Sequence, residues 1–213
     1  MLVAVARPIL PSGEPQRVTD LRNAAETAIH QCLDLGAEES IAIVTDDERR
    51  AIAEALYEVA AETTDDATFV QYPPGEQHGA EPPEPVAAAM QAADAFLAPT
   101  TRSLSHTRAR SAACEAGARG ATLPGITERV MVEGLDADYE AIAQHCADVL
   151  EQVRDAEEMR VTSPAGTDIT FDVGGREWHD DTGMVREPGS FSNLPAGEVF
   201  VAPASADRSE EHT

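Results

Sequence analysis

The chain has 213 residues, which is enough for one large domain or for one domain and part of a second. It carries 39 Asp and Glu residues against 15 Arg residues and no Lys, so its formal net charge is −24. The acids are spread along the chain and predict a dense anionic surface, which repels nucleic-acid phosphates and anionic lipids. Nucleic acid and membrane are therefore not expected as partners. Concentrated salt screens such a surface, so we predict a halophilic protein.

The cysteines and the N-terminal segment predict a cytoplasmic location. Cys32, Cys114 and Cys146 lie far apart in apolar or Ala-rich segments without a CxxC spacing, which favours buried free thiols. The first residues, MLVAVARPIL, are interrupted by Arg7 and Pro8 too early for a secretory signal. No run of about 18 apolar residues is present, so no membrane span is expected.

Helical and strand patterns alternate along the first part of the chain. Four short apolar runs predict strands at residues 41–44, 68–72, 95–98 and 120–123, and they recur every 25 to 27 residues. Helical periodicity precedes the first run, at residues 18–35, and fills each interval between the runs. Strands that alternate with helices are joined by crossovers and are parallel. The pattern predicts an α/β fold with an N-terminal open parallel sheet and helices on both faces.

The pattern changes after a long predicted helix at residues 136–153, which closes an N-terminal α/β domain over residues 1–157. From Met159 onward apolar and polar residues alternate around the turn PAGTD, which predicts an antiparallel hairpin. Residues 158–213 are interpreted as the incomplete start of a β-rich α+β catalytic domain. The last residues, SADRSEEHT, are polar and carry no strand or helix pattern.

Three short motifs follow predicted strands, where α/β sheets bind ligands. After the first strand, Asp46 and Asp47 occupy the place of a bound phosphate, which makes a dinucleotide site unlikely on chemical grounds. After the third strand, Ser105 is either a helix N-cap or part of a site, and His106 faces either a substrate or an interface. Thr127 is expected to cap the helix that follows the fourth strand.

The segment from Gly175 to Pro203 is rich in turn residues and carboxylates. Glu198 stands in it directly before the apolar run 199–201, which is predicted as a strand entering a core. Carboxylates on a turn-rich loop suit a hard metal ion, although such loops are more often solvated connectors. Trp178 and His179 either line a pocket or pack against the hairpin. The residues alone leave both alternatives open.

Two sets of motifs together resemble a known family. SLSHT and GARGATLPGIT in the first part, with VTSPAGTDITFDV and REPGSFSNLPAGEVFVAP in the second, resemble the thermophilic metallo-aminopeptidases of the aminopeptidase T or leucyl-aminopeptidase-like group. The resemblance implies an aminopeptidase that releases N-terminal amino acids from a peptide substrate. It also implies two divalent metal ions (Zn, Co or Mg) per complete active site, with Glu198 as a metal ligand, and a homodimer.

The same resemblance leaves two alternatives. Members of this family continue past the NLPAGEVF motif and carry their other metal ligands there, so the chain is expected to be truncated in its catalytic domain. Asn193 and Gly197 are expected to shape the loop that presents Glu198. A related branch opens hydroxylated pyridine rings with one ferrous ion and O₂, and the sequence is compatible with that dioxygenase activity. The third interpretation is a non-catalytic α/β scaffold.

Overall fold

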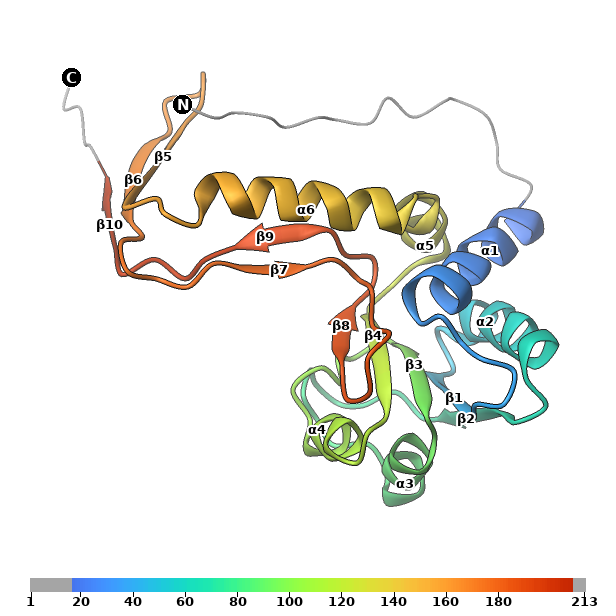
Figure 1. Cartoon of the computed structure of the whole chain (residues 1–213). Helices are drawn as coiled ribbons and strands as arrows, with labels where there is room; N and C mark the ends of the chain where they lie inside the picture. Colours follow the sequence, from blue (N-terminus) through green and yellow to red (C-terminus); the bar gives the residue numbers. More distant parts are fainter. Residues whose placement is uncertain (1–16, 209–213) are drawn as a thin grey trace.

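The structure is a computed structural model that describes residues 17–208. These residues form an α/β body with a long projecting arm (Figure 1). The helices are α1 (Arg17–Glu26), the π-helical turn η1 (Thr27–Cys32), α2 (Arg50–Thr63), α3 (Glu84–Ala92), α4 (Arg108–Glu115), α5 (Glu128–Leu135) and α6 (Tyr139–Val153). The strands are β1 (Ile41–Asp46), β2 (Ala67–Tyr72), β3 (Ala95–Thr100), β4 (Arg119–Pro124), β5 (Glu158–Thr162), β6 (Asp168–Asp172), β7 (His179–Asp181), β8 (Phe191–Asn193), β9 (Glu198–Phe200) and β10 (Ser205–Arg208).

The body is built on a five-stranded sheet in the order β2-β1-β3-β4-β8, and its neighbouring strands are all parallel. The open parallel sheet predicted from the strand–helix alternation is therefore confirmed. The fifth strand, β8, comes from the segment after residue 157 and pairs with β4 through the register Thr122↔Asn193. The predicted catalytic segment thus returns to the sheet of the predicted N-terminal domain.

Helices cover both faces of this sheet, as predicted. Alternate residues of a strand point to opposite faces, so β1 places Ile41 and Ile43 in one core and Ala42 and Val44 in the other. The first core is closed by α1, η1, α2 and α5, and the second by α3 and α4. The central strands are therefore buried on both sides, as the fully buried residues of β1 and β3 show.

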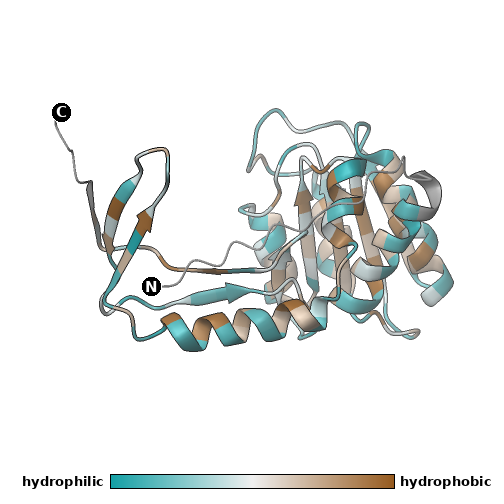
Figure 2. Cartoon of the chain, turned by 90° about the horizontal axis from the view of Figure 1, so that it is seen from above, coloured by the Kyte–Doolittle hydropathy of each residue, from teal (hydrophilic) through white to brown (hydrophobic). Residues whose placement is uncertain are grey.

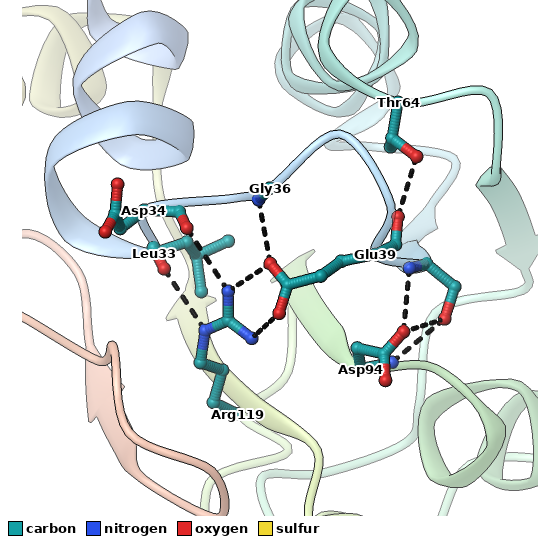
Figure 3. A network of polar contacts seen from close by, with 8 residues as sticks. Leu33, Asp34, Gly36, Glu39, Thr64, Asp94 and Arg119 are labelled. Atoms are coloured by element: carbon teal, nitrogen blue, oxygen red, sulfur yellow. Dashed lines mark hydrogen bonds and ion pairs between the residues drawn. The ribbon is translucent and has the colours of Figure 1, made fainter.

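The amino end of the sheet is closed by an ion-pair network (Figure 3). Arg119, the first residue of β4, is 6% exposed and donates two hydrogen bonds of 2.7 Å to the carboxylate of Glu39. Its guanidinium also donates to the carbonyl oxygens of Leu33 and Asp34. Glu39 precedes β1, so this network ties the start of β1 to the start of β4. The amino ends of these two strands are therefore fixed relative to each other.

The arm consists of α6, the two-stranded ribbon β7–β9 and a three-stranded sheet in the order β10-β6-β5 (Figures 1 and 2). Along α6 the structure buries only Tyr139 and Cys146, because its C-terminal half extends away from the body and is packed on one side by the ribbon. The predicted hairpin is confirmed as β5 and β6, with Val161 opposite Ile169.

Two expectations for the last part of the chain are wrong. Residues Ser205–Arg208, expected to carry no strand, form β10 and pair antiparallel with β6, because an open strand edge accepts a polar strand through its backbone. The run 199–201 does not enter a core: it lies on the ribbon, where Phe200 is 46% exposed. Within residues 17–208, no helix is long and apolar enough to cross a membrane.

Candidate functional site

The carboxyl ends of β1, β3, β4 and β8 form the edge of the sheet that we call the rim. At β1, the carboxylate of Asp46 is fully buried and accepts hydrogen bonds from the backbone N–H and the hydroxyl of Thr101, at 2.6 and 2.9 Å. It also accepts the backbone N–H of Glu48 at 3.2 Å, just before α2. A protein carboxylate therefore fills the position where a nucleotide phosphate would bind. The absence of a dinucleotide site, expected from Asp46 and Asp47, stays a prediction.

A second group of polar side chains joins β3, β4 and β8 at the rim, and we call it the hydroxyl–amide cluster: Ser103, Ser105, Thr122 and Asn193. Asn193 Oδ1 lies 2.7 Å from Ser105 Oγ and 2.6 Å from Thr122 Oγ1. The two hydroxyl oxygens lie 2.7 Å apart, and Ser103 Oγ donates to Ser105 Oγ at 2.9 Å. Ser105 and Thr122 are buried, whereas Asn193 is exposed. The cluster therefore presents a fixed amide to solvent.

The predicted N-cap role of Ser105 is wrong, and its predicted part in a site stays a prediction. Thr107, not Ser105, caps α4 by accepting the N–H of Arg110. The backbone carbonyl of Ser105 accepts Arg110 Nε at 2.8 Å, and the same guanidinium lies 4.5 Å from the ring centroid of Phe191. Ser105 is thus held from both its side chain and its backbone. His106, the next residue, is exposed. Among the described residues, it has no hydrogen-bond or ionic partner.

Glu198 lies on the ribbon β7–β9, directly across from Asp181. Residues in register on an antiparallel pair project to the same face, so the two carboxylates share one side of the ribbon. Asp181 Oδ1 accepts from the buried hydroxyl of Ser192 at 2.7 Å and from the N–H of Gly183 at 3.1 Å. Since Ser192 precedes Asn193 on β8, this bond connects the ribbon to the hydroxyl–amide cluster.

The loop that presents Glu198 is anchored to α6. The hydroxyl oxygen of the fully buried Tyr139 accepts the backbone N–H of Ala196 at 3.4 Å, and the thiol of Cys146 contacts the carbonyl oxygen of Glu198 at 3.9 Å. The pKa of Cys146 is raised, first by burial and then by the nearby carboxylates of Asp180, Asp181 and Glu198. The thiol therefore remains protonated beside the ribbon, and its sulfur is a poor metal ligand in that state.

The other residues singled out in the sequence are placed as follows. The ring of His179 stacks at 5.6 Å on Phe200 across the ribbon, and Trp178 Nε1 is buried without a hydrogen-bond partner among residues 17–208. Cys32, Cys114 and Cys146 are free, and Cys114 is only partly buried. Burial raises the pKa of Cys32 to about 12. The expected helix cap at Thr127 is confirmed, because its hydroxyl accepts the N–H of Val130.

The described residues do not by themselves form a metal centre. Within residues 17–208 there is no group of three His, Cys, Asp or Glu side chains placed to hold an ion. Metal sites in proteins take several converging ligands, and Glu198 with Asp181 opposite offers two carboxylates at most. No chemical step is therefore assigned to a metal ion here.

A cavity of about 560 Å³ opens beside the rim, where α1, α2 and α5 meet. Its walls are mostly apolar, with Arg49 and Glu48 at the end that follows β1. Its lining includes no member of the hydroxyl–amide cluster and no residue of the ribbon. The cavity and the cluster are separate features of the same end of the sheet.

Comparison with known proteins gives one family and two related folds. Residues 20–209 match the family model NicX, described as 2,5-dihydroxypyridine 5,6-dioxygenase. The structure is similar to a 2,5-dihydroxypyridine dioxygenase from Pseudomonas putida KT2440, with a TM-score of 0.64 and 18% sequence identity over 91% of this chain. It is also similar to AmpT from Thermus thermophilus, with a TM-score of 0.53 and 20% identity over 89% of this chain. At these identities, both likenesses concern the fold.

The chain spans 57% of the length of the Pseudomonas enzyme and 63% of the length of AmpT. No curated protein matched it. The similarity to AmpT agrees in fold with the aminopeptidase resemblance of the sequence. The family model that matches the chain is instead that of the 2,5-dihydroxypyridine 5,6-dioxygenases. The match includes the motifs that supply the hydroxyl–amide cluster and the ribbon.

Proposed function

Since the chain belongs to the NicX family of 2,5-dihydroxypyridine 5,6-dioxygenases, we propose that it contributes to the oxygen-dependent opening of a hydroxylated pyridine ring. The observation that carries the proposal is the extent of the match, residues 20–209, because it spans the α/β body and the arm together. The likeness in fold to the Pseudomonas dioxygenase supports the same activity.

The rim is the part of the chain suited to bind such a ring. In open α/β sheets, ligands bind outside the carboxyl ends of the strands. At β1 the carboxylate of Asp46 is occupied by hydrogen bonds from Thr101, whereas the hydroxyl–amide cluster at β3, β4 and β8 includes the exposed Asn193. Hydroxyl and amide groups there can hydrogen-bond ring oxygens without adding charge. This arrangement suits a small, neutral or singly charged, oxygen-bearing ring.

Glu198 is the residue that we propose as a metal ligand. Ring opening by O₂ in this branch would use one ferrous ion, which would mediate the transfer of electrons from the ring to O₂. A single carboxylate cannot hold that ion, so its occupancy depends on ligands other than those that the described residues bring together. Asp181, fixed by Ser192 and Gly183, would keep the ribbon in the orientation that presents Glu198 toward the rim.

Aminopeptidase activity is the second candidate, because the fold is also similar to AmpT and because Glu198 stands in the NLPAGEVF motif. It would require a peptide substrate and two divalent ions of Zn, Co or Mg. Two ions about 3.5–4 Å apart need several bridging and terminal ligands. The described residues supply fewer of these than a single-ion centre would need.

The two candidates predict different ligands for the purified chain in molar KCl. We expect saturable binding of 2,5-dihydroxypyridine, measured by equilibrium dialysis, and no binding of a leucyl dipeptide. We also expect O₂ consumption that requires both ferrous iron and the pyridine. Leucine release on addition of Zn, Co or Mg, without pyridine binding, would contradict the proposed dioxygenase activity and support the aminopeptidase activity.

The metal role of Glu198 can be tested independently of turnover. We expect Glu198→Gln to weaken ferrous-iron binding at least about tenfold, because losing even a supporting group of a metal site costs that much. Glu177→Gln is the matched control: it makes the same charge change at an exposed residue outside the ribbon. Binding is measured anaerobically by titration with elemental analysis. Equal iron affinity in both variants would show that Glu198 is not a ligand of the metal ion.

A further inference from the structure

Asn193 is an exposed residue whose side-chain oxygen is hydrogen-bonded to two buried hydroxyl groups. Its backbone is the last residue of β8, in register with Thr122 of β4, at the carboxyl end of the sheet. Its side-chain oxygen is within 2.7 Å of the hydroxyl oxygens of both Ser105 and Thr122. Ser105 is 3% exposed and Thr122 is 0% exposed, so the groups that hold the amide cannot move without disturbing the core.

The protons of the cluster determine which way the amide faces. Each hydroxyl donates one hydrogen. The hydroxyls of Ser105 and Thr122 both donate to Asn193 Oδ1, at 2.7 and 2.6 Å. An amide oxygen can accept both protons, whereas an NH₂ group in that position could accept neither. The oxygen therefore faces inward and the NH₂ group faces outward.

The outward NH₂ group has no partner within the protein. Among residues 17–208, Asn193 makes side-chain hydrogen bonds only through Oδ1, and the residue is exposed. Two N–H donors of fixed direction thus stand at the rim, at the end of β8. A pair of preorganised donors favours a ligand oxygen, because little orientational entropy is lost when it binds.

We infer that Asn193 is a ligand-contacting residue whose side-chain N–H groups donate hydrogen bonds to an oxygen of the ring substrate. The acceptor is a ring carbonyl or a ring hydroxylate, since Asn193 offers only donors on its outer side. This inference rests on the proposed function for the identity of the ring. It assigns Ser105 and Thr122 a positioning role, because they hold the amide and do not reach the ligand themselves.

The substitution Asn193→Asp keeps the inward hydrogen-bond acceptor of this side chain and removes its outward N–H donors. A carboxylate accepts the hydroxyls of Ser105 and Thr122 as the amide oxygen does, so the thermal midpoint should stay close to that of the parent chain. The outer side changes from two donors to an acceptor with a negative charge. We expect the dissociation constant for 2,5-dihydroxypyridine to rise about 10- to 100-fold.

Asn23→Asp is the matched control. Asn23 is the other asparagine of the chain. It lies exposed on α1, outside the hydroxyl–amide cluster, and undergoes the same change of side chain and charge. It should bind the pyridine like the parent chain in molar KCl. Equal affinity of the Asn193→Asp variant and the parent would overturn the inference and leave the proposed function intact. Failure of the parent chain to bind the pyridine would overturn both.

A second measurement detects ligand contact in the parent chain itself. With only two asparagines, the side-chain NH₂ signals of Asn193 can be assigned in a nitrogen-15 spectrum by their loss in the Asn193→Asp variant. Saturating 2,5-dihydroxypyridine should shift this pair and leave the pair of Asn23 in place. An unshifted Asn193 pair at saturation would overturn the inference.

Discussion

Replacing Gly120 with alanine is expected to destabilise the fold by about 3 kcal/mol, the upper part of the range for overpacking a core. Gly120 on β4 lies opposite Phe96 on β3. An added Cβ would collide with the carbonyl oxygen of Phe96 and approach its ring carbon Cγ to 2.7 Å. Phe96 is fully buried, so neither its backbone nor its ring can withdraw.

The loss of stability is measured by denaturant unfolding in molar KCl. For a domain of this size, it corresponds to a fall in the thermal midpoint of roughly 6 to 12 °C. Gly75→Ala is the control, because a Cβ at that position would make only ordinary contacts of 3.7 Å or more. An unchanged midpoint in the Gly120→Ala variant would show that β3 and β4 can separate, and the position of Thr122 two residues along β4 would then be in question.

The second large effect is expected at the buried guanidinium of Arg119 (Figure 3). Arg119→Leu leaves Glu39 without its partner and the carbonyl oxygens of Leu33 and Asp34 without a donor. Breaking a buried ion pair from one side costs roughly 3 to 5 kcal/mol. Since the Glu39 side chain is 32% exposed and regains some hydration, we expect a loss of about 3 kcal/mol in the free energy of unfolding.

The same pair predicts a dependence of stability on pH. The hydrogen bonds from Arg119 hold the pKa of Glu39 below its usual 4.5, in spite of partial burial. A carboxyl group whose folded-state pKa is depressed stabilises the fold above its unfolded-state pKa, and that contribution is lost as the pH falls through the folded-state value. Stability should therefore decline below about pH 4.5, and the decline should be shallower in Glu39→Gln.

The control for this prediction is the pair of Glu62 with Arg22. The pKa of Glu62 is also lowered by a hydrogen bond to arginine, but its side chain is 60% exposed. Exposed pairs contribute little because solvent and salt screen them. Denaturant unfolding from about pH 7 to about pH 3 should show a parent-like profile for Glu62→Gln. Parent-like behaviour of Glu39→Gln as well would assign the acid sensitivity to other carboxylates.

The predicted site and the observed one overlap in part. The sequence indicated Ser105, His106, Asp46 and Glu198, and the structure places Asp46 and Ser105 in hydrogen-bond networks at the rim. Thr122 was not singled out because a threonine inside a strand carries no signal of function by itself. Its role depends on Asn193, which lies 71 residues later in the chain.

The sequence did not distinguish Asp181 from the other acidic residues of its turn-rich segment. Its place opposite Glu198 follows from the register of β7 with β9, and strands of three residues are too short to reveal an alternation pattern. The expected core strand at 199–201 was wrong for the same reason. Three apolar residues fit a buried strand as well as a strand on an exposed ribbon.

By itself, the sequence determined the parallel sheet, its covering helices and the hairpin, because these follow from periodicities of 3.6 and 2 that burial imposes on neighbouring residues. Only the tertiary structure decided that β8 returns to pair with β4 and that β10 completes the distal sheet. It alone joined Ser105 to Asn193, across 88 residues. The physical reason is that strand pairing uses backbone groups that every residue carries, so the partner of a short strand is selected by the packing of the whole fold.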